Sequence, residues 1–343
     1  MANARSPAEI GALIHDMWPE VIVTQIEALS HTGWGGDYDA FLINGRDIFL
    51  FSRHPRAARV LAVERRLLPR LAPRVALPIP SFRYIAPDAP MAPPRCVGYA
   101  AIPGEPLTPT LFQRTATTGS ILGHMADQLG AFLSGLHSCP LWVAEECGLS
   151  GPALSPLEQV SQSYHDVRVG VYPVLGSGER HFLDRLFAAF LADVRQAPWP
   201  PTLCHGDLTS DHILIDPSNG GHITGIIDFG DVCLGDPAGD FVWRYACGDA
   251  FFRRVLACYR APMGDGEAFV RRVVHRYHLI AIVEIAYGLE TATRDILRKV
   301  ATRSNDWQRR TQRFDRCERR HGRMPAASSL VLRRTYHVSG VAL

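Results

Sequence analysis

The sequence predicts a protein of the α+β class, in which a small antiparallel β-sheet precedes a mostly helical part. Short alternating or β-branched apolar runs crowd residues 21–102, whereas long apolar stripes with helical spacing dominate after residue 120. Pro103-Gly104-Glu105-Pro106 breaks regular structure between the two parts. We therefore predict a bilobal chain with three segments: an N-lobe (1–103), a C-lobe (104–304) and a basic extension (305–343).

The N-lobe should begin with a helix and three strands. Ser6 before Pro7 is typical of a helix start, and this helix should run to about Trp18. Asn44-Gly45 is a strong hairpin turn, so the strands on either side of it should pair antiparallel. The three expected strands span residues 21–29, 38–43 and 47–51.

A glycine-rich loop, Ser30 to Asp37, separates the first two of these strands. Glycines without Cβ atoms would let backbone amides approach the phosphates of a nucleotide. Glycine-rich hairpins without any ligand are also common, so the loop alone is a weak signal. The glycines concerned are Gly33, Gly35 and Gly36.

A helix over residues 56–71 follows, with Glu64 in the middle of its apolar stripe. A carboxylate in that position usually has a partner, because burial without one is costly. The alternative is that Glu64 lies at the edge of the stripe and is solvated. Two further strands, over residues 81–85 and 96–102, should complete the sheet.

The C-lobe pattern is helical at three places, over residues 120–136, 179–194 and 267–303. Residues 139–177 read as loop-rich with weak helices. Glu284 and Glu290 in the last helix would, on pattern alone, form a solvated face.

The most informative stretch spans residues 203–231. Two apolar runs with the length of buried strands, 213–215 and 223–227, are joined by a turn-forming segment. An antiparallel hairpin of this shape brings its two ends together. We therefore expect Asp207 and His212, before the first strand, to lie near Asp228, after the second.

Such a group suits metal-assisted phosphoryl transfer. Asp207 could accept a proton from a substrate hydroxyl, while Asp228 and His212 could hold Mg²⁺. Histidine is a soft ligand for Mg²⁺, where Asn or Asp is more usual. The alternative is a hairpin with ordinary turn aspartates and a capping histidine.

The motifs of this stretch resemble those of the aminoglycoside O-phosphotransferases. This family is a branch of the protein-kinase-like superfamily, which also holds macrolide, choline and fructosamine kinases. Macrolide kinases and 2″-aminoglycoside kinases often carry histidine at the position of His212, and the Asp-Phe-Gly-Asp run is closer to the 2″ group. The matching residues are His205-Gly206-Asp207-Leu208, His212-Ile213-Leu214, Ile226-Ile227-Asp228-Phe229-Gly230-Asp231, Asp236-Pro237 and Asp240-Phe241.

The resemblance implies a bilobal protein-kinase-like fold and a reaction. The γ-phosphate of ATP or GTP would pass to a hydroxyl of an aminoglycoside-like antibiotic, with Mg²⁺ as cofactor and Asp207 as catalytic residue. The implied nucleotide contacts are Gly33, Gly35, Gly36, Arg53, Glu64, Tyr99, Ala101, Ile102 and Ile227. The implied acceptor contacts are Asp231, Asp249, Glu284 and Tyr287, and the implied supports of the loop are His205 and Asp240.

One departure from the family pattern is plain. Kinase-like folds place a lysine on the third strand to hold phosphates, and here that position is Leu50. Arg53 is the best stand-in and the natural partner for Glu64. Strand alternation, however, puts Arg53 on the opposite face from Leu50 unless the strand ends or bulges there. The chain has a single lysine, Lys299.

Composition and charge limit the classes of protein to which the chain can belong. Hydrophobic residues make up 47% of the chain, its eight cysteines lack Cys-x-x-Cys spacing, and no run of 18 apolar residues occurs. We expect a cytoplasmic protein with neither a zinc site nor membrane insertion. The net charge of +2 combines an Arg-rich tail with an acidic body that suits a cationic acceptor; a nucleic-acid role is not expected.

Two rival functions stay open at this point. One keeps the chemistry and changes the acceptor to a macrolide, a peptide antibiotic or a metabolite. The other is a nucleotide-binding protein whose catalysis is impaired by the missing lysine. The sequence leaves the oligomeric state open.

Overall fold

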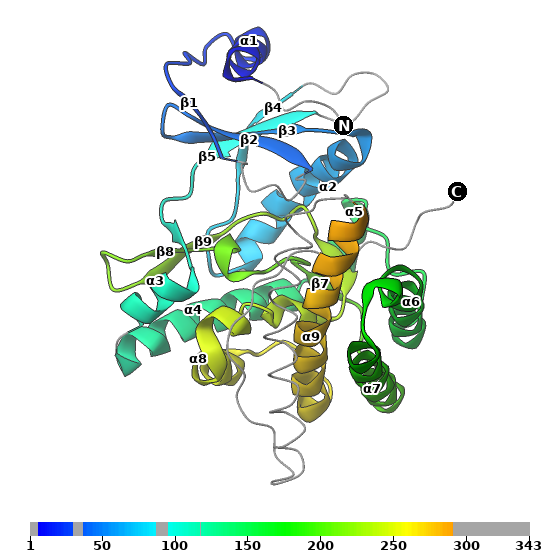
Figure 1. Ribbon diagram of the computed structural model, residues 1–343. Coiled ribbons are helices and arrows are strands. Elements are labelled where there is room, and N and C mark those ends of the chain that lie inside the picture. The colour runs from blue at the N-terminus through cyan, green and yellow to red at the C-terminus, as the bar shows by residue number, and fades with distance from the viewer. Residues whose placement is uncertain (1–5, 30–36, 87–94, 117, 291–343) are drawn as a thin grey trace.

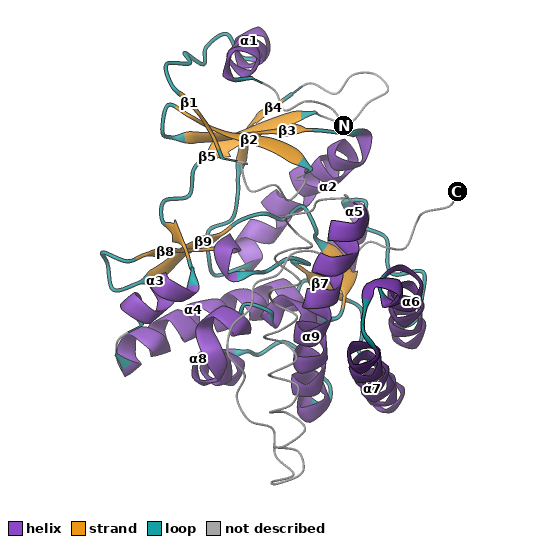
Figure 2. Cartoon of the chain, viewed as in Figure 1, coloured by secondary structure: helices purple, strands orange, loops and turns teal. Residues whose placement is uncertain are grey.

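The computed structural model describes residues 6–29, 37–86, 95–116 and 118–290. Its N-terminal part is a five-stranded antiparallel sheet in the order β1-β2-β3-β5-β4 (Figure 1). The remainder is mostly helical, so the α+β class is confirmed (Figure 2). The strands are β1 (Ile26–Ala28), β2 (Tyr38–Ile43), β3 (Asp47–Ser52), β4 (Phe82–Ile85) and β5 (Cys96–Ala100). The proposed boundary at residue 103 falls between β5 and β6 and stays a prediction.

The two faces of this sheet have different partners. One face packs its phenylalanines, Phe41, Phe49 and Phe51, against Ile10 and Ile14 of α1 (Pro7–Met17). The other face meets α2 (Pro55–Leu71), as the hydrogen bonds from β2 to that helix show. Alternation along β2 and β3 therefore sorts side chains between a core above the sheet and a helix below it.

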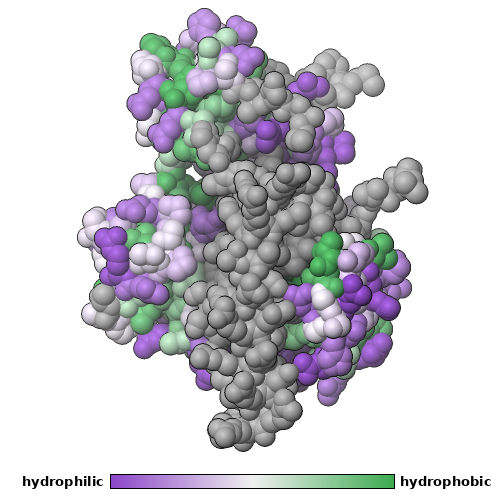
Figure 3. Space-filling view, in the orientation of Figure 1, coloured by the Kyte–Doolittle hydropathy of each residue, from purple (hydrophilic) through white to green (hydrophobic). Residues whose placement is uncertain are grey.

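Helix α1 begins where the sequence predicted. The Ser6 side chain caps it, and the Glu9 carboxylate accepts the backbone N–H of Ser6, which completes a capping box. The first strand is much shorter than expected, since only Ile26–Ala28 pairs with β2. Large apolar side chains around it are exposed, with Ile22 77% accessible, and Figure 3 shows green surface in this upper region of the molecule.

The helical part is built around α4 (Gly119–His137), whose buried face includes Met125, Leu129, Phe132 and Leu136. Helix α8 lies against it, as α6 lies against α7 and α7 against α9. The other helices are α3 (Pro109–Thr115), α5 (Leu141–Glu146), α6 (Pro156–Gly170), α7 (Ser177–Gln196), α8 (Arg244–Cys258) and α9 (Gly266–Glu290).

One expectation about this part was only partly right. Residues 139–177, expected to be loop-rich with weak helices, hold α5 and a regular 15-residue helix, α6. Ser155 and Glu158 form a capping box at its start, and Pro156 occupies the first turn. Val160 is the single fully buried residue of α6, and its apolar stripe is narrow, with Leu157, Tyr164 and Val167 only partly buried.

The predicted hairpin is present as β8 (Ile213–Asp216) and β9 (His222–Ile226), with the short β6 (Glu105–Pro106) on its outer edge. It lies between the N-terminal sheet and α4 in Figure 1. A second pair was not predicted: β7 (Thr202–Cys204) bonds to β10 (Cys233–Gly235). This pair ties the beginning of the 203–231 stretch to its end, so the loops at both ends of the hairpin are held together. Within the described part of the chain, no helix has the length and apolarity needed to cross a bilayer.

Candidate active site

Asp207, His212 and Asp228 meet at one place, as the hairpin predicted. One nitrogen or oxygen atom from each side chain lies within 4.8 Å of the others. His212 Nε2 is 3.3 Å from Asp228 Oδ2, and His212 Nδ1 is 3.8 Å from Asp207 Oδ2. The convergence is therefore confirmed, while the catalytic and metal-binding roles of the three residues stay predictions.

The tautomer of His212 follows from its backbone partner. Its Nδ1 lies 2.7 Å from the carbonyl oxygen of Asp207, and a carbonyl can only accept, so Nδ1 must carry a proton. In the neutral ring this leaves the Nε2 lone pair directed at Asp228, the arrangement of a metal-ligating histidine held by a second partner. Burial alone would lower the pKa of His212, but the carboxylates of Asp228 and Asp207 outweigh it and raise that pKa.

Asp228 is the most accessible of the three side chains, at 38% against 7% for Asp207. Its backbone has a φ of 67°, in the left-handed region that non-glycine residues rarely adopt. Two carboxylates and one imidazole around a partly open point fit a divalent cation that also binds an outside ligand. The residues present therefore fit the Mg²⁺ that the sequence suggested.

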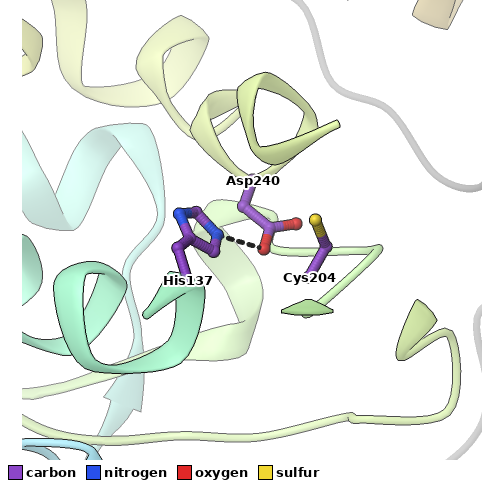
Figure 4. A group of neighbouring side chains, drawn as sticks. All are labelled: His137, Cys204 and Asp240. Atoms are coloured by element: carbon purple, nitrogen blue, oxygen red, sulfur yellow. Dashed lines mark hydrogen bonds and ion pairs between the residues drawn. The ribbon is translucent and has the colours of Figure 1, made fainter. Parts of the chain in front are cut away.

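The carboxylate of Asp240 holds the backbone of the loop that precedes Asp207. One of its oxygens accepts the N–H of His205 at 2.6 Å, and the other accepts the N–H of Gly206 at 3.0 Å. His137 Nε2 lies 3.0 Å from the same carboxylate (Figure 4). Burial by itself would raise the pKa of Asp240, but these hydrogen bonds and the nearby histidines lower it. A fully buried charged carboxylate thus fixes the backbone of the loop.

His137, Cys204 and Asp240 form the second group in the described residues with metal-ligand chemistry (Figure 4). Both ring nitrogens of His137 are already used, Nδ1 by the Tyr259 hydroxyl at 2.8 Å and Nε2 by Asp240. Burial raises the pKa of the Cys204 thiol well above its usual range. Because the thiol keeps its proton and both nitrogens of His137 are hydrogen-bonded, this group supports the loop structurally rather than binding a metal.

His205 links the same loop to the end of β9. Its Nε2 lies 3.0 Å from the carbonyl oxygen of Ile227, so Nε2 carries the proton, and its Nδ1 accepts the N–H of Asp207 at 3.3 Å. Burial lowers the pKa of His205 to about 4, which keeps the ring neutral. His205 and His212 are therefore protonated at different ring nitrogens, His205 at Nε2 and His212 at Nδ1.

Gly206 is required by the close approach of two loops. Its φ is 84°, and a Cβ on this residue would lie 2.0 Å from the carbonyl oxygen of Asp231. No side chain fits there without moving the backbone of one loop. The glycine of His205-Gly206-Asp207 is thus explained by contact between the segments that carry Asp207 and Asp231.

The expected pairing of Arg53 with Glu64 is wrong. The Nε of Arg53 lies 3.2 Å from Asp39 Oδ1, and Asp39 shares the sheet face of Phe41, away from α2. Glu64 is buried, 3% exposed, and its partner is the hydroxyl of Tyr38 at 3.1 Å. Strand alternation decided the outcome, since Arg53 follows β3 with the parity of Phe51 rather than Leu50. A role for Arg53 at the nucleotide stays a prediction, now without geometric support.

Glu64 gives a testable pH dependence. Burial raises its pKa from 4.5 to about 8, and the Asp228 carboxylate adds to the shift. Because the folded-state pKa exceeds the unfolded value, the folded chain binds an additional proton between these values and loses stability as the pH rises. Compared with Glu64→Gln, the wild type should lose unfolding free energy between about pH 5 and about pH 8. Urea denaturation of both proteins at the two pH values checks this, and a constant difference would contradict it.

The remaining predicted nucleotide contacts lie around β5 and β9. Tyr99 is buried on β5, and Ile102 lies beside Gly225, whose added Cβ would be 2.7 Å from Ile102 Cγ2. The N–H of Ala101 already donates to the carbonyl of Arg46 at 2.8 Å. Any backbone recognition of a base would therefore use other groups of this segment. Gly33, Gly35 and Gly36 lie outside the described residues.

The predicted acceptor contacts are only partly described. Asp249 is held by Arg244, with Nη2 2.5 Å from Oδ1. Asp231 is half-buried and follows the Asp228 turn. Glu284 and Tyr287 belong to α9, but their side chains lie outside what the structure describes. The sequence did not predict that Tyr38 contacts Glu64. The available signal was a hydroxyl on the strand that pairs with the strand of Leu50.

Comparison with known proteins gives consistent results. A family model described as the phosphotransferase enzyme family matches residues 33–287. Among solved structures, the GDP and kanamycin complex of APH(2″)-IIIa matches with a TM-score of 0.74 and 26% identity, over 86% of this chain and 96% of that chain. The bilobal protein-kinase-like fold predicted from the sequence is thereby confirmed.

Two more distant structures share the fold alone. The gentamicin complex of APH(2″)-IIa matches with a TM-score of 0.66 and 21% identity, over 88% of this chain and 96% of that chain. The macrolide 2′-phosphotransferase MphH from Brachybacterium faecium matches with a TM-score of 0.63 and 22% identity, over 85% and 96% of the two chains.

A curated protein also matches over a short region. The uncharacterized protein YcbJ of Bacillus subtilis is 34% identical over 99 residues. The match covers 28% of this chain, and the chain spans 30% of the length of YcbJ.

Proposed function

Because this chain belongs to the phosphotransferase enzyme family, whose model matches residues 33–287, we propose that it phosphorylates a hydroxyl of an aminoglycoside-like antibiotic. The donor would be GTP or ATP. The observation that carries the proposal is the meeting of Asp207, His212 and Asp228 at the ends of one hairpin. One proton acceptor and two cation ligands at one point are what phosphoryl transfer to an alcohol requires.

Asp207 would orient the acceptor hydroxyl and take its proton. Its backbone is fixed on both sides, because its N–H donates to His205 Nδ1 and its carbonyl accepts from His212 Nδ1. A side chain attached to so constrained a backbone can be aimed without reorganisation during the reaction. With little covalent work to do, positioning of this kind supplies much of the catalysis.

His212 Nε2 and the Asp228 carboxylate would hold Mg²⁺. When bound, this ion would offset the negative charge of the nucleotide phosphates. The partly exposed Asp228 leaves room for a ligand from outside the protein, whereas the buried His212 is fixed by its bond to Asp207. The division between an open and a buried ligand supports a metal that binds together with a nucleotide.

One similarity supports a cationic acceptor and a guanine nucleotide, while the pairing of nearby aspartates reduces the negative charge available to such an acceptor. The APH(2″)-IIIa structure reported above, at 26% identity, is a complex with GDP and kanamycin. Several aspartates between residues 204 and 249 are already paired with arginines or hydrogen-bond donors, and these are Asp216, Asp236, Asp240 and Asp249. The negative charge of this segment is thus partly neutralised within the protein, and Asp231, beside the Asp228 turn, remains the proposed acceptor contact.

A donor–acceptor matrix tests the proposal directly. The purified chain is incubated with Mg²⁺ and either GTP or ATP, together with kanamycin, gentamicin, a macrolide or no acceptor. Mass spectrometry then detects addition of one phosphate. Transfer to an aminoglycoside supports the proposal; transfer to the macrolide alone would move it to the macrolide kinases. Nucleotide binding without transfer to any acceptor would contradict a kinase function.

His212 should be more important for metal binding than for loop structure. His212→Ala should weaken Mg²⁺-dependent nucleotide binding by about 10–100-fold, the usual cost of disturbing a metal site. His212→Asn restores a harder oxygen ligand and should raise the preference for Mg²⁺ over Zn²⁺ relative to the wild type. Isothermal titration with each metal measures both effects.

A matched control exists at the other end of the same hairpin. His222 lies in the β8–β9 turn region, where its Nδ1 is 3.3 Å from the Asn219 carbonyl. His222→Asn should leave the metal dependence of nucleotide binding unchanged. Equal effects of the two histidine-to-asparagine substitutions would exclude a specific metal role for His212.

A further inference from the structure

The position on β3 where kinase-like folds carry a lysine is occupied here by an uncharged residue, Leu50. Leu50 is half-buried on β3, opposite Ala40 of β2 and Val97 of β5. The single lysine of the chain, Lys299, lies outside the described residues. Glu64 of α2 is nevertheless buried, so something other than a lysine from β3 must stabilise it there.

Tyr38 lies on the same face of the sheet as Leu50. It pairs with Ser52 in the antiparallel register, two residues along each strand from the Ala40–Leu50 pair. Its hydroxyl lies 3.1 Å from Glu64 Oε1 and 3.3 Å from the carbonyl oxygen of Ala57. Ala57 and Glu64 are two turns apart on one stripe of α2, so the hydroxyl contacts the helix at two levels.

The ring of Tyr38 also lies close to the turn that carries Asp228. A Cβ added to Gly230 would lie 3.4 Å from Tyr38 Cε2 and 3.4 Å from Asp228 Oδ1. A single added carbon would thus be in van der Waals contact with both groups, so the tyrosine ring lies next to the Asp228 turn. Tyr38 therefore belongs to β2, bonds to α2 and lies next to the Asp228 turn.

We propose that Tyr38 is a positioning residue whose hydroxyl and ring join β2, α2 and the Asp228 turn, forming an uncharged bridge where kinase-like folds use a lysine–glutamate ion pair. The inference rests on the function proposed above and concerns the same site. The bridge fixes the N-lobe relative to the metal ligands without adding a positive charge. The nucleotide phosphates are then neutralised by groups other than a side chain of β3.

The protonation of Glu64 agrees with this geometry. Burial raises the pKa of Glu64 to about 8, so at neutral pH the carboxyl is mostly uncharged. The Tyr38 hydroxyl donates to Glu64 Oε1, and this bond needs no charge on the carboxyl group. A lysine in place of Leu50 would instead favour the ionised carboxylate.

The test compares two tyrosines of the same sheet. Tyr38→Phe removes only the hydroxyl and should lower kcat about tenfold, the value of one well-placed hydrogen bond, with the KM for the acceptor unchanged. Tyr84→Phe is the matched control, because Tyr84 is half-buried on β4 and stacks on Phe49 at the opposite face. Equal kcat values for the two variants would overturn the inference.

Variants at Glu64 separate a bridge from general packing. Glu64→Gln keeps an acceptor for the Tyr38 hydroxyl and should retain more activity than Glu64→Leu, which has none. Tyr38→Phe combined with Glu64→Leu should be no worse than Glu64→Leu alone, because both remove the same bond. Losses that multiply in the double variant would show that the residues act independently, against the proposal.

Nucleotide titration keeps this inference distinct from the proposed function. If the wild type binds Mg²⁺–GTP but phosphorylates no acceptor, the proposed function fails while the bridge can still be tested. In that case Tyr38→Phe, but not Tyr84→Phe, should weaken Mg²⁺–GTP binding about tenfold. Unchanged binding would overturn the bridge, and a wild type without nucleotide binding would overturn both.

Discussion

Replacing Asp207 by asparagine is expected to lower kcat at least about 100-fold, the range for losing a general base. Asparagine has nearly the same shape, so the backbone bonds of residue 207 to His205 and His212 should persist. The side chain loses only its capacity to take a proton. Binding of Mg²⁺–nucleotide should therefore stay close to that of the wild type, and the loss should appear in kcat rather than in the KM for the nucleotide.

Steady-state kinetics with the acceptor found in the donor–acceptor matrix measures this effect. Asp216→Asn is the control, since Asp216 ends β8 and accepts from Ser218 in the exposed turn of the same hairpin. This control should keep wild-type kcat. An Asp207→Asn variant with near-normal turnover would remove Asp207 from the role of base.

The second large effect concerns stability. Asp240→Ala should reduce the unfolding free energy by about 3–5 kcal/mol, as expected when one member of a buried charged group is removed. The substitution leaves three donors without their acceptor: the N–H groups of His205 and Gly206, and His137 Nε2. These groups are too deeply buried for water to replace the carboxylate without rearrangement.

Urea denaturation of the metal-free protein gives the comparison, with Asp249→Ala as control. The Asp249–Arg244 pair is partly exposed, with side chains 19% and 21% accessible, so its loss should cost only about 0–1 kcal/mol. Similar destabilisation by the two substitutions would mean that Asp240 does not carry the loop as described.

The sequence predicted the hairpin and the meeting of Asp207, His212 and Asp228 because both depend on local information. Two β-branched runs and a turn-forming segment between them determine the hairpin, and the hairpin alone brings its ends together. The same kind of information located α1, β2 and β3 within a residue or two.

What the sequence could not predict depends on partners far apart in the chain. Arg53 was chosen as partner for Glu64 by charge and proximity, yet its partner Asp39 comes from the neighbouring strand. The β7–β10 pair joins two three-residue strands, too short for alternation to show. Tyr38 reaches Glu64 across a strand and a helix, 26 positions apart, and no periodic pattern records such a contact.

The left-handed backbone of Asp228 has a consequence for engineering this chain. A φ of 67° costs an ordinary residue roughly 1–2 kcal/mol, and glycine would adopt it without strain. A selection for thermal resistance alone would therefore favour glycine at position 228 and discard the carboxylate. Tolerance of heat and capacity for turnover are opposed at this residue, so stabilising substitutions are better sought in the helical part than at the metal turn.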